Sequence, residues 1–86
     1  MQPVAERAIL EFRGILVPAS FAEFARHRAA RLALDLTALE ETQTGARYAL
    51  AGPADLLDAF EMALSLGPAD CLVLDVVRLG NAGETG

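Results

Sequence analysis

A chain of 86 residues is long enough for one small domain and too short for two. Its hydrophobic fraction of 53% excludes intrinsic disorder, and its net charge of −5 argues against general nucleic-acid binding. The single cysteine excludes an internal disulfide and a cysteine-based zinc site. The apolar runs are too short to span a membrane and the chain opens with no apolar leader, so we expect a cytoplasmic protein.

Residues 8–16 alternate apolar and polar side chains with the period of a β-strand, and a glycine and a proline then predict a loop. Ser20 followed by Glu23 is a capping box, in which the hydroxyl accepts from an early helix amide while the carboxylate reaches back. We therefore predict a helix that runs to about Ala33. Its buried stripe is expected to comprise Phe21, Phe24, Ala25, Ala29 and Leu32.

The next two strands, over 34–41 and 46–51, are predicted to form a hairpin through the turn residues 42–45. A Gly-Pro pair at 52–53 opens a second helix, and another at 67–68 ends it. The buried stripe of this helix is expected to comprise Leu56, Leu57, Phe60, Ala63 and Leu64. Residues 71–79 predict the last strand.

A strand, helix, hairpin, helix and strand fold compactly in one familiar way, the ferredoxin-like βαββαβ arrangement. We predict a four-stranded antiparallel sheet in the order 4-1-3-2, with both helices on one face. The domain is expected to span residues 1–80, and 81–86 to form a flexible tail.

The segment from Gly14 to Ala22 resembles the phosphate-binding loop of the acylphosphatases, G-x-V-Q-G-V-G-F-R, which also joins a first strand to a first helix. The resemblance continues through the hairpin to the two Gly-Pro pairs and covers nearly the whole chain. It lies in the spacing of these features and implies the fold. In that family, loop amides and an arginine bind the phosphoryl group, and an asparagine on the second strand positions the attacking water.

Carried over to this chain, the arginine of the family falls on Ala22 and the asparagine on Glu40. Alanine cannot hold a phosphate, and a glutamate there would repel a dianionic substrate. Pro18 occupies a glycine position and has no amide hydrogen, and Ser20 replaces a second glycine. The degenerate phosphate loop comprises Gly14, Pro18, Ala19, Ser20 and Phe21.

The resemblance therefore implies an acylphosphatase-like module without catalytic residues, a pseudoenzyme, and no phosphate-type ligand is expected. The alternative is an acylphosphatase with a rearranged site, in which Arg13 or Arg26 replaces the lost arginine. Arg26 follows Ala22 by about one helical turn, so its side chain could reach back. No cofactor or metal is expected in either case.

One basic patch stands out on this acidic chain, formed by Arg26, His27, Arg28 and Arg31. It could dock an acidic partner or a small anion. The competing interpretation is a solvated helix face whose charges are paired with Glu23 and its neighbours.

The sheet face away from the helices is predicted to be unusually apolar. Its expected outward residues are Ile9, Leu39, Ala49, Ala51, Leu72, Leu74 and Val76. These could merge into one patch with charged residues at its rim, and a patch of this kind usually marks an interface. We therefore expect a homodimer or a complex with another protein, with no nucleic-acid or membrane partner.

Overall fold

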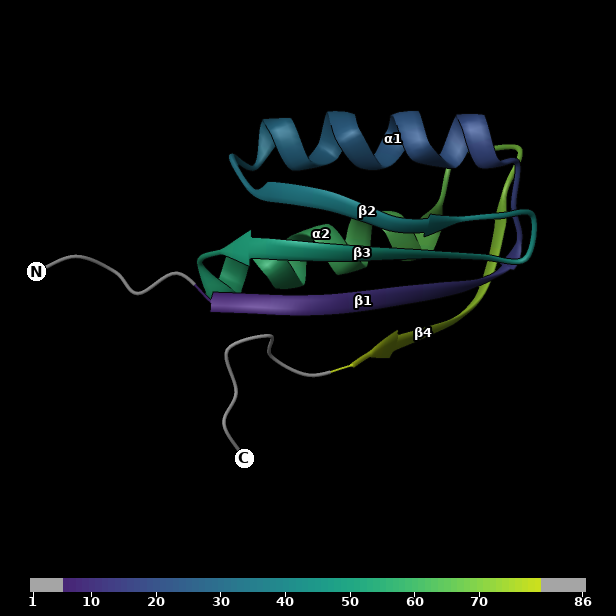
Figure 1. Ribbon diagram of the computed structural model, residues 1–86. Coiled ribbons are helices and arrows are strands. Elements are labelled where there is room, and N and C mark those ends of the chain that lie inside the picture. Colours follow the sequence, from purple (N-terminus) through teal and green to yellow (C-terminus); the bar gives the residue numbers. More distant parts are fainter. Residues whose placement is uncertain (1–5, 80–86) are drawn as a thin grey trace, which may run out of the picture.

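A computed structural model describes residues 6–79, which form six elements in the predicted order (Figure 1). The elements are β1 (Glu6–Ile15), α1 (Pro18–Arg31), β2 (Asp35–Glu41), β3 (Gly45–Gly52), α2 (Ala54–Leu66) and β4 (Leu72–Arg78). Every boundary lies within two residues of its prediction except the start of α1. The tail predicted for 81–86 lies outside the described residues.

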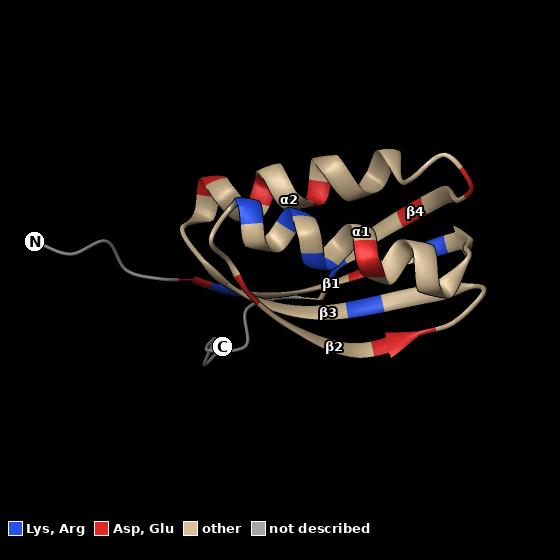
Figure 2. Cartoon of the chain, turned by 90° about the horizontal axis from the view of Figure 1, so that it is seen from above, with Lys and Arg blue, Asp and Glu red and all other residues tan. Residues whose placement is uncertain are grey.

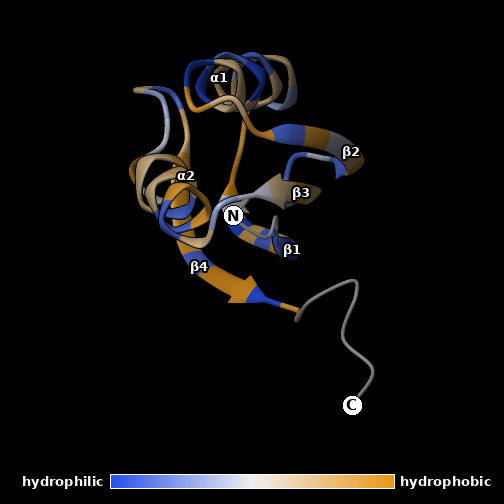
Figure 3. Ribbon diagram, turned by 90° about the vertical axis from the view of Figure 1, so that its left-hand side faces the viewer, coloured by the Kyte–Doolittle hydropathy of each residue, from blue (hydrophilic) through white to orange (hydrophobic). Residues whose placement is uncertain are grey.

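The four strands form one antiparallel sheet in the order β2-β3-β1-β4, which confirms the predicted ferredoxin-like fold. Both helices lie on the same face of this sheet, and no helix or strand of residues 6–79 covers the other face, which we call the open face (Figure 3). The strands β2 and β4 are the two edges. The structure therefore consists of a helical layer and a sheet whose second face is open.

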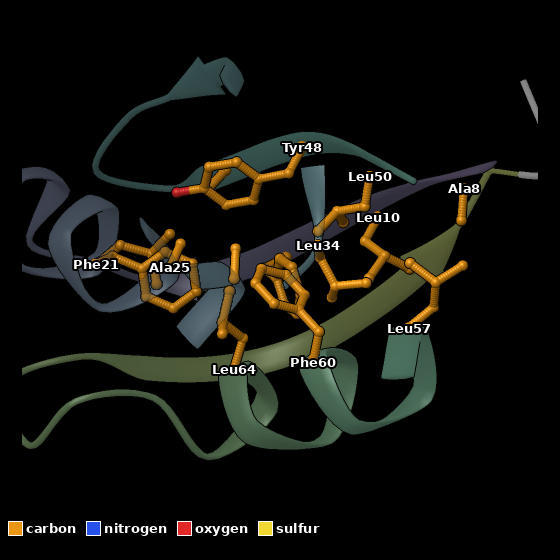
Figure 4. Close-up of a cluster of buried hydrophobic side chains, with 14 residues drawn as sticks. Ala8, Leu10, Phe21, Ala25, Leu34, Tyr48, Leu50, Leu57, Phe60 and Leu64 are labelled. Atoms are coloured by element: carbon orange, nitrogen blue, oxygen red, sulfur yellow. The ribbon is translucent and has the colours of Figure 1, made fainter. Parts of the chain in front are cut away.

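The core lies between the sheet and the helices and is centred on four aromatic rings (Figure 4). The Phe12 ring centroid lies 5.6 Å from that of Phe21, 6.3 Å from that of Tyr48 and 6.5 Å from that of Phe60. All four side chains are buried. Edge-to-face aromatic contacts of this kind stabilise a core beyond the burial of area, which matters in a domain this small.

The turns follow the predicted residues. The Thr42 hydroxyl accepts from the amides of Thr44 and Gly45, at 3.3 and 3.0 Å, which closes the β2–β3 hairpin. At the end of α2, Gly67 has a φ of 67°, a conformation that glycine adopts without strain. Thr42, in the predicted turn, and Gly67, at the predicted helix end, therefore shape the chain through local backbone conformation and hydrogen bonds.

Two β-bulges change the faces of the edge strands. One lies in β2 between Ala38 and Glu40, and the other shifts the β1–β4 pairing between Arg13 and Gly14. A bulge adds one residue to one strand, so the residues beyond it point to the opposite face from the one simple alternation predicts. Both bulges fall in segments that the sequence assigned to function.

Candidate functional site

The loop between β1 and α1 is where the resemblance predicts a phosphate cradle, but three of its amides, those of Gly14, Leu16 and Val17, already have acceptors inside the protein. The Gly14 amide donates to the carbonyl oxygen of Thr44, at 3.1 Å. The Leu16 amide donates to the carbonyl oxygen of Gln43, at 2.8 Å. These bonds fasten the loop to the β2–β3 hairpin. Because the donors have acceptors inside the protein, they are not directed at an external anion.

The next amide, that of Val17, donates to the Sγ of Cys71, at 3.3 Å. Burial raises the pKa of the Cys71 thiol above its ordinary value, so the group is a thiol and not a thiolate at neutral pH. Cys71 lies just before β4, and this contact joins the loop to the edge strand. The cysteine therefore has a structural contact in the loop that the sequence did not reveal.

The start of α1 differs from the predicted capping box. The helix begins at Pro18 with Val17 as its N-cap, and no side chain caps it. Ser20 lies inside the first turn, where its hydroxyl donates to Asp70 Oδ1 at 2.8 Å. Glu23 lies 3.9 Å from His27 and does not reach back. The capping-box prediction is wrong because proline is already suited to the first helical position, which starts the helix before the serine.

Asp70 also changes the electrostatics of the loop. Between Leu16 and Phe21, only Ala19 and Ser20 have amide hydrogens without an acceptor among residues 6–79. The Asp70 carboxylate lies beside this first turn, held by the Ser20 hydroxyl. A carboxylate near a helix N-terminus is favourable with the helix dipole, and it repels a second anion. A phosphoryl group at this first turn would therefore meet the negative charge of Asp70.

The two positions that correspond to the family's catalytic residues lie on different faces of the sheet. Ala22 is only 6% exposed, on the helix side. Glu40 pairs with Arg47 across the strands, and its Oε1 lies 3.5 Å from Arg47 Nη2 on the open face. The bulge at Leu39 turns Glu40 away from the helices. The structure therefore does not bring Ala22 and Glu40 together.

Glu41, not Glu40, is the acidic residue of β2 that faces the helix side. The Tyr48 hydroxyl donates to Glu41 Oε2 at 2.8 Å. Burial, and then the bond to Glu41, raise the pKa of the Tyr48 phenol above its ordinary value, while the nearby Arg26 guanidinium lowers it slightly. This pair was not visible in the sequence, because the bulge at Leu39 turns Glu41 instead of Glu40 to the face of the single tyrosine. The pair satisfies a buried polar group.

This buried phenol predicts a fall in stability at alkaline pH. Its folded pKa exceeds the unfolded value of 10.0, so its contribution is complete below pH 10.0 and is lost as the pH rises toward the folded pKa. We expect the free energy of unfolding to fall by about 1.4 kcal/mol per pH unit above pH 10.0. Urea unfolding of the wild type and of Tyr48→Phe measures the effect, since the chain has no lysine to titrate in this range.

The Phe variant is the control, because the cysteine and the terminal groups titrate equally in both proteins. The difference in unfolding free energy between the two should change with pH only in the alkaline range. A pH-independent difference would show that the phenol ionises as easily in the folded protein as in the unfolded one.

The residues of the basic patch lie on different sides of α1. Arg26 lies toward Tyr48, whereas the Arg28 guanidinium lies over the Phe24 ring, 5.7 Å from its centroid, on the side of α2. His27 pairs with Glu23. None of the three arginines has an ion pair within residues 6–79. The interpretation in which neighbouring carboxylates neutralise this patch is therefore not supported for the arginines.

The open face of the sheet carries a charge network at its centre. Glu11 and Arg47 are partners on the two central strands, with 4.0 Å between Glu11 Oε2 and Arg47 Nη2. Arg13 Nε donates to the same Glu11 oxygen at 2.8 Å. These residues were predicted to form the rim of one apolar patch. They instead divide the face, because β1 and β3 are the middle strands.

The predicted interface residues therefore do not form one patch. Ile9, Ala49 and Ala51 are half-buried on the central strands, and Leu39 lies at the β2 bulge on the far edge. Val76 packs against the core and is corrected to the helix side, because it pairs with the buried Phe12. The bulge at Leu74 causes this exchange of faces in β4.

An exposed apolar corner is left at the end of β1 and the start of β4, formed by Ile15, Val17, Leu72 and Leu74. Ile15 and Leu72 are cross-strand partners, and Ile15 is 65% exposed. Leu74 is 68% exposed on the edge strand. The hydropathy colours of β4 show this concentration (Figure 3). Ile15 and Val17 were not among the predicted interface residues, because the sequence assigned them to a strand end and to a ligand-binding loop.

Within residues 6–79, no cluster of three side chains suited to a metal ion occurs, and neither helix has the length and apolar character needed to cross a membrane.

Comparison with solved structures finds the same fold in an acylphosphatase from Coxiella burnetii, with a TM-score of 0.80 and 18% sequence identity. The match covers 91% of this chain and 81% of that one. Full-length HypF, solved in a phosphate- and nucleotide-bound form, matches with a TM-score of 0.80 and 15% identity over 94% of this chain and 11% of its own. No family model matches the sequence, and neither does any curated protein. These likenesses show an acylphosphatase-like fold.

Proposed function

We propose that this acylphosphatase-like domain is a non-catalytic cytoplasmic module that acts through protein association, as a homodimer or as a subunit of a larger assembly. The observation that carries the proposal is the exposed apolar corner at Ile15, Val17, Leu72 and Leu74, which adjoins an unpaired strand edge. Apolar residues grouped in this way on a small domain usually mark an interface.

The engaged loop supports the non-catalytic half of the proposal. An acylphosphatase cradle needs amides directed at the phosphoryl group, and in this loop the Gly14, Leu16 and Val17 amides have internal acceptors. The Asp70 carboxylate lies beside the two amides that have none. Electrostatic stabilisation is usually the largest contribution to such catalysis, so its reversal at this loop opposes the reaction.

The edge strand supports the association half. Within residues 6–79, β4 pairs only with β1, so no described strand occupies its outer backbone groups and a strand from a partner could pair with them. Leu72 and Leu74 lie on that strand, and Ile15 continues their surface onto β1. A partner strand added to β4 would thus gain backbone hydrogen bonds and cover apolar side chains together.

The association can be tested with Leu74→Glu. A carboxylate at the centre of an apolar interface should weaken binding by about a hundredfold or more, since its burial costs several kcal/mol. Light scattering over a range of concentrations measures the mass of the wild type and the variant. The matched control is Leu39→Glu, which places the same charge at an exposed leucine on the opposite edge.

A wild type that stays monomeric at high concentration would remove the homodimer form of the proposal. The subunit form is then tested by crosslinking in the native cell. A crosslinked partner that persists unchanged in Leu74→Glu would contradict the corner as the interface.

A further inference from the structure

A groove runs between the two helices, on the side of the sheet opposite to the open face. It has a volume of about 430 Å³ and a lining of mainly apolar side chains. The lining residues are Phe24, Arg28, Ala59, Met62, Ala63, Leu66 and Gly67. Met62 and Leu66 are 69% and 80% exposed, and they are the two most exposed large apolar residues of the described chain. No other described segment covers them.

The charge on the α1 wall of this groove has one sign. Arg28 lines it from α1, and Arg31 lies three residues further along the same side of the helix. Both arginines lie in the last turn of α1, where the helix dipole favours a cation. Neither has a carboxylate partner within residues 6–79. Figure 2 shows α1 beside α2, with the basic residues on α1 and only acidic ones on α2.

The acidic residues of α2 do not neutralise these arginines. Asp58 and Glu61 lie on the far side of α2, where Arg78 Nη2 approaches them at 3.1 and 3.0 Å. Asp55, in the first turn of α2, does not line the groove and forms no ion pair with Arg28 or Arg31. The groove therefore combines an apolar floor with two cations along one wall only. A ligand that fits it needs apolar groups along its length and negative charge along one side.

We infer that this groove is a docking site for an acidic amphipathic helix of a partner protein. Apolar side chains at helical spacing would enter between Phe24, Met62 and Leu66, and carboxylates one turn apart would meet Arg28 and Arg31. A helix suits a groove between two helices because its ridges of side chains fit such a channel. The inference is independent of the association proposed at Leu74, which lies on the edge strand.

A second copy of this chain fits the groove less well. Its α2 is amphipathic and acidic, but Asp58 and Glu61 are already paired with Arg78 and would have to leave that cation to reach Arg28 and Arg31. Only Asp55 of α2 has no ion pair within residues 6–79, so a second copy offers one free carboxylate for two arginines. The occupant is accordingly a helix whose carboxylates are free.

The test uses the full-length, isotope-labelled protein and two lactam-bridged helical peptides of about four turns. Both peptides carry leucines at helical spacing, one with flanking glutamates and its twin with lysines at the same positions. The glutamate peptide should shift the amide resonances of Phe24, Arg28, Met62 and Leu66 and bind at least about tenfold more tightly than the lysine twin.

The double variant Arg28→Glu with Arg31→Glu should reverse this preference, and Arg28→Gln with Arg31→Gln should abolish it. Arg13→Glu on the open face is the matched control and should leave it unchanged. Resonance dispersion shows that each variant is folded. Equal binding of the twins, shifts confined to another surface, or no shift at millimolar peptide would each overturn the inference. Dilution-dependent shifts of the groove residues without peptide would assign the groove to a second copy and overturn it as well.

Discussion

The purified protein is expected to hydrolyse benzoyl phosphate no faster than buffer. A working enzyme accelerates its reaction by about 10⁶-fold or more, so an active acylphosphatase assayed in parallel separates the two results clearly. The expectation follows from the loop, in which three amides donate to Thr44, Gln43 and Cys71, and Asp70 supplies a competing negative charge. Repairing single residues does not redirect those amides.

Ala22→Arg combined with Pro18→Gly should therefore also fail to hydrolyse the substrate. In this variant the lost guanidinium and one amide are restored while the internal hydrogen bonds of Gly14 and Leu16 remain. Turnover well above the buffer rate in the wild type would contradict the proposed function. If Arg26→Ala then abolished it, the activity would belong to a rearranged site that uses Arg26.

Gly14→Ala is expected to destabilise the fold by about 3 kcal/mol. A Cβ at this position would overlap the backbone carbonyl oxygen of Leu72 and lie 3.0 Å from the Leu74 nitrogen. These are backbone atoms of β4, so the clash can be relieved only by moving the edge strand, and overpacking of this kind costs about 1–3 kcal/mol or more. The thermal midpoint should fall by roughly 15 °C.

Gly45→Ala is the matched control for this prediction. It also lies on a strand, but its added Cβ would meet the Phe12 carbonyl oxygen at 3.5 Å, an ordinary contact. Its unfolding free energy should change by less than about 0.5 kcal/mol. If Gly14→Ala unfolded at the same urea concentration as the control, β4 would not be held as closely to β1 as the pairing indicates.

A destabilised Gly14→Ala variant would also explain why glycine stands at this position, on which the resemblance to the acylphosphatase loop depends. Gly14 coincides with the first glycine of the acylphosphatase loop, where the expected reason for glycine is access of the backbone to a phosphate. In this chain the close approach of β4 at the bulge is sufficient reason. The glycine can therefore persist without any ligand.

The order of elements, the hairpin and the two-layer fold could be predicted from the sequence, because each depends on signals that are local. The alternation around Leu10 and Phe12 determines which face of β1 is buried, and the Gly-Pro pairs bound α2. The alanine at position 22, where the resemblance places the arginine of the acylphosphatases, was equally visible, since it needs only the position of one residue.

Only the tertiary structure decided which faces the edge strands present and where the charges meet. The bulges at Leu39 and Leu74 carry no sequence signal, yet they turn Glu40 outward, bring Glu41 to Tyr48 and pack Val76 against the core. The carboxylate of Asp70 lies 50 residues along the chain from Ser20, and only the packing of β4 beside the loop brings the two into contact. Local periodicity determined the fold, whereas contacts distant in sequence decided which amides of the loop have acceptors inside the protein.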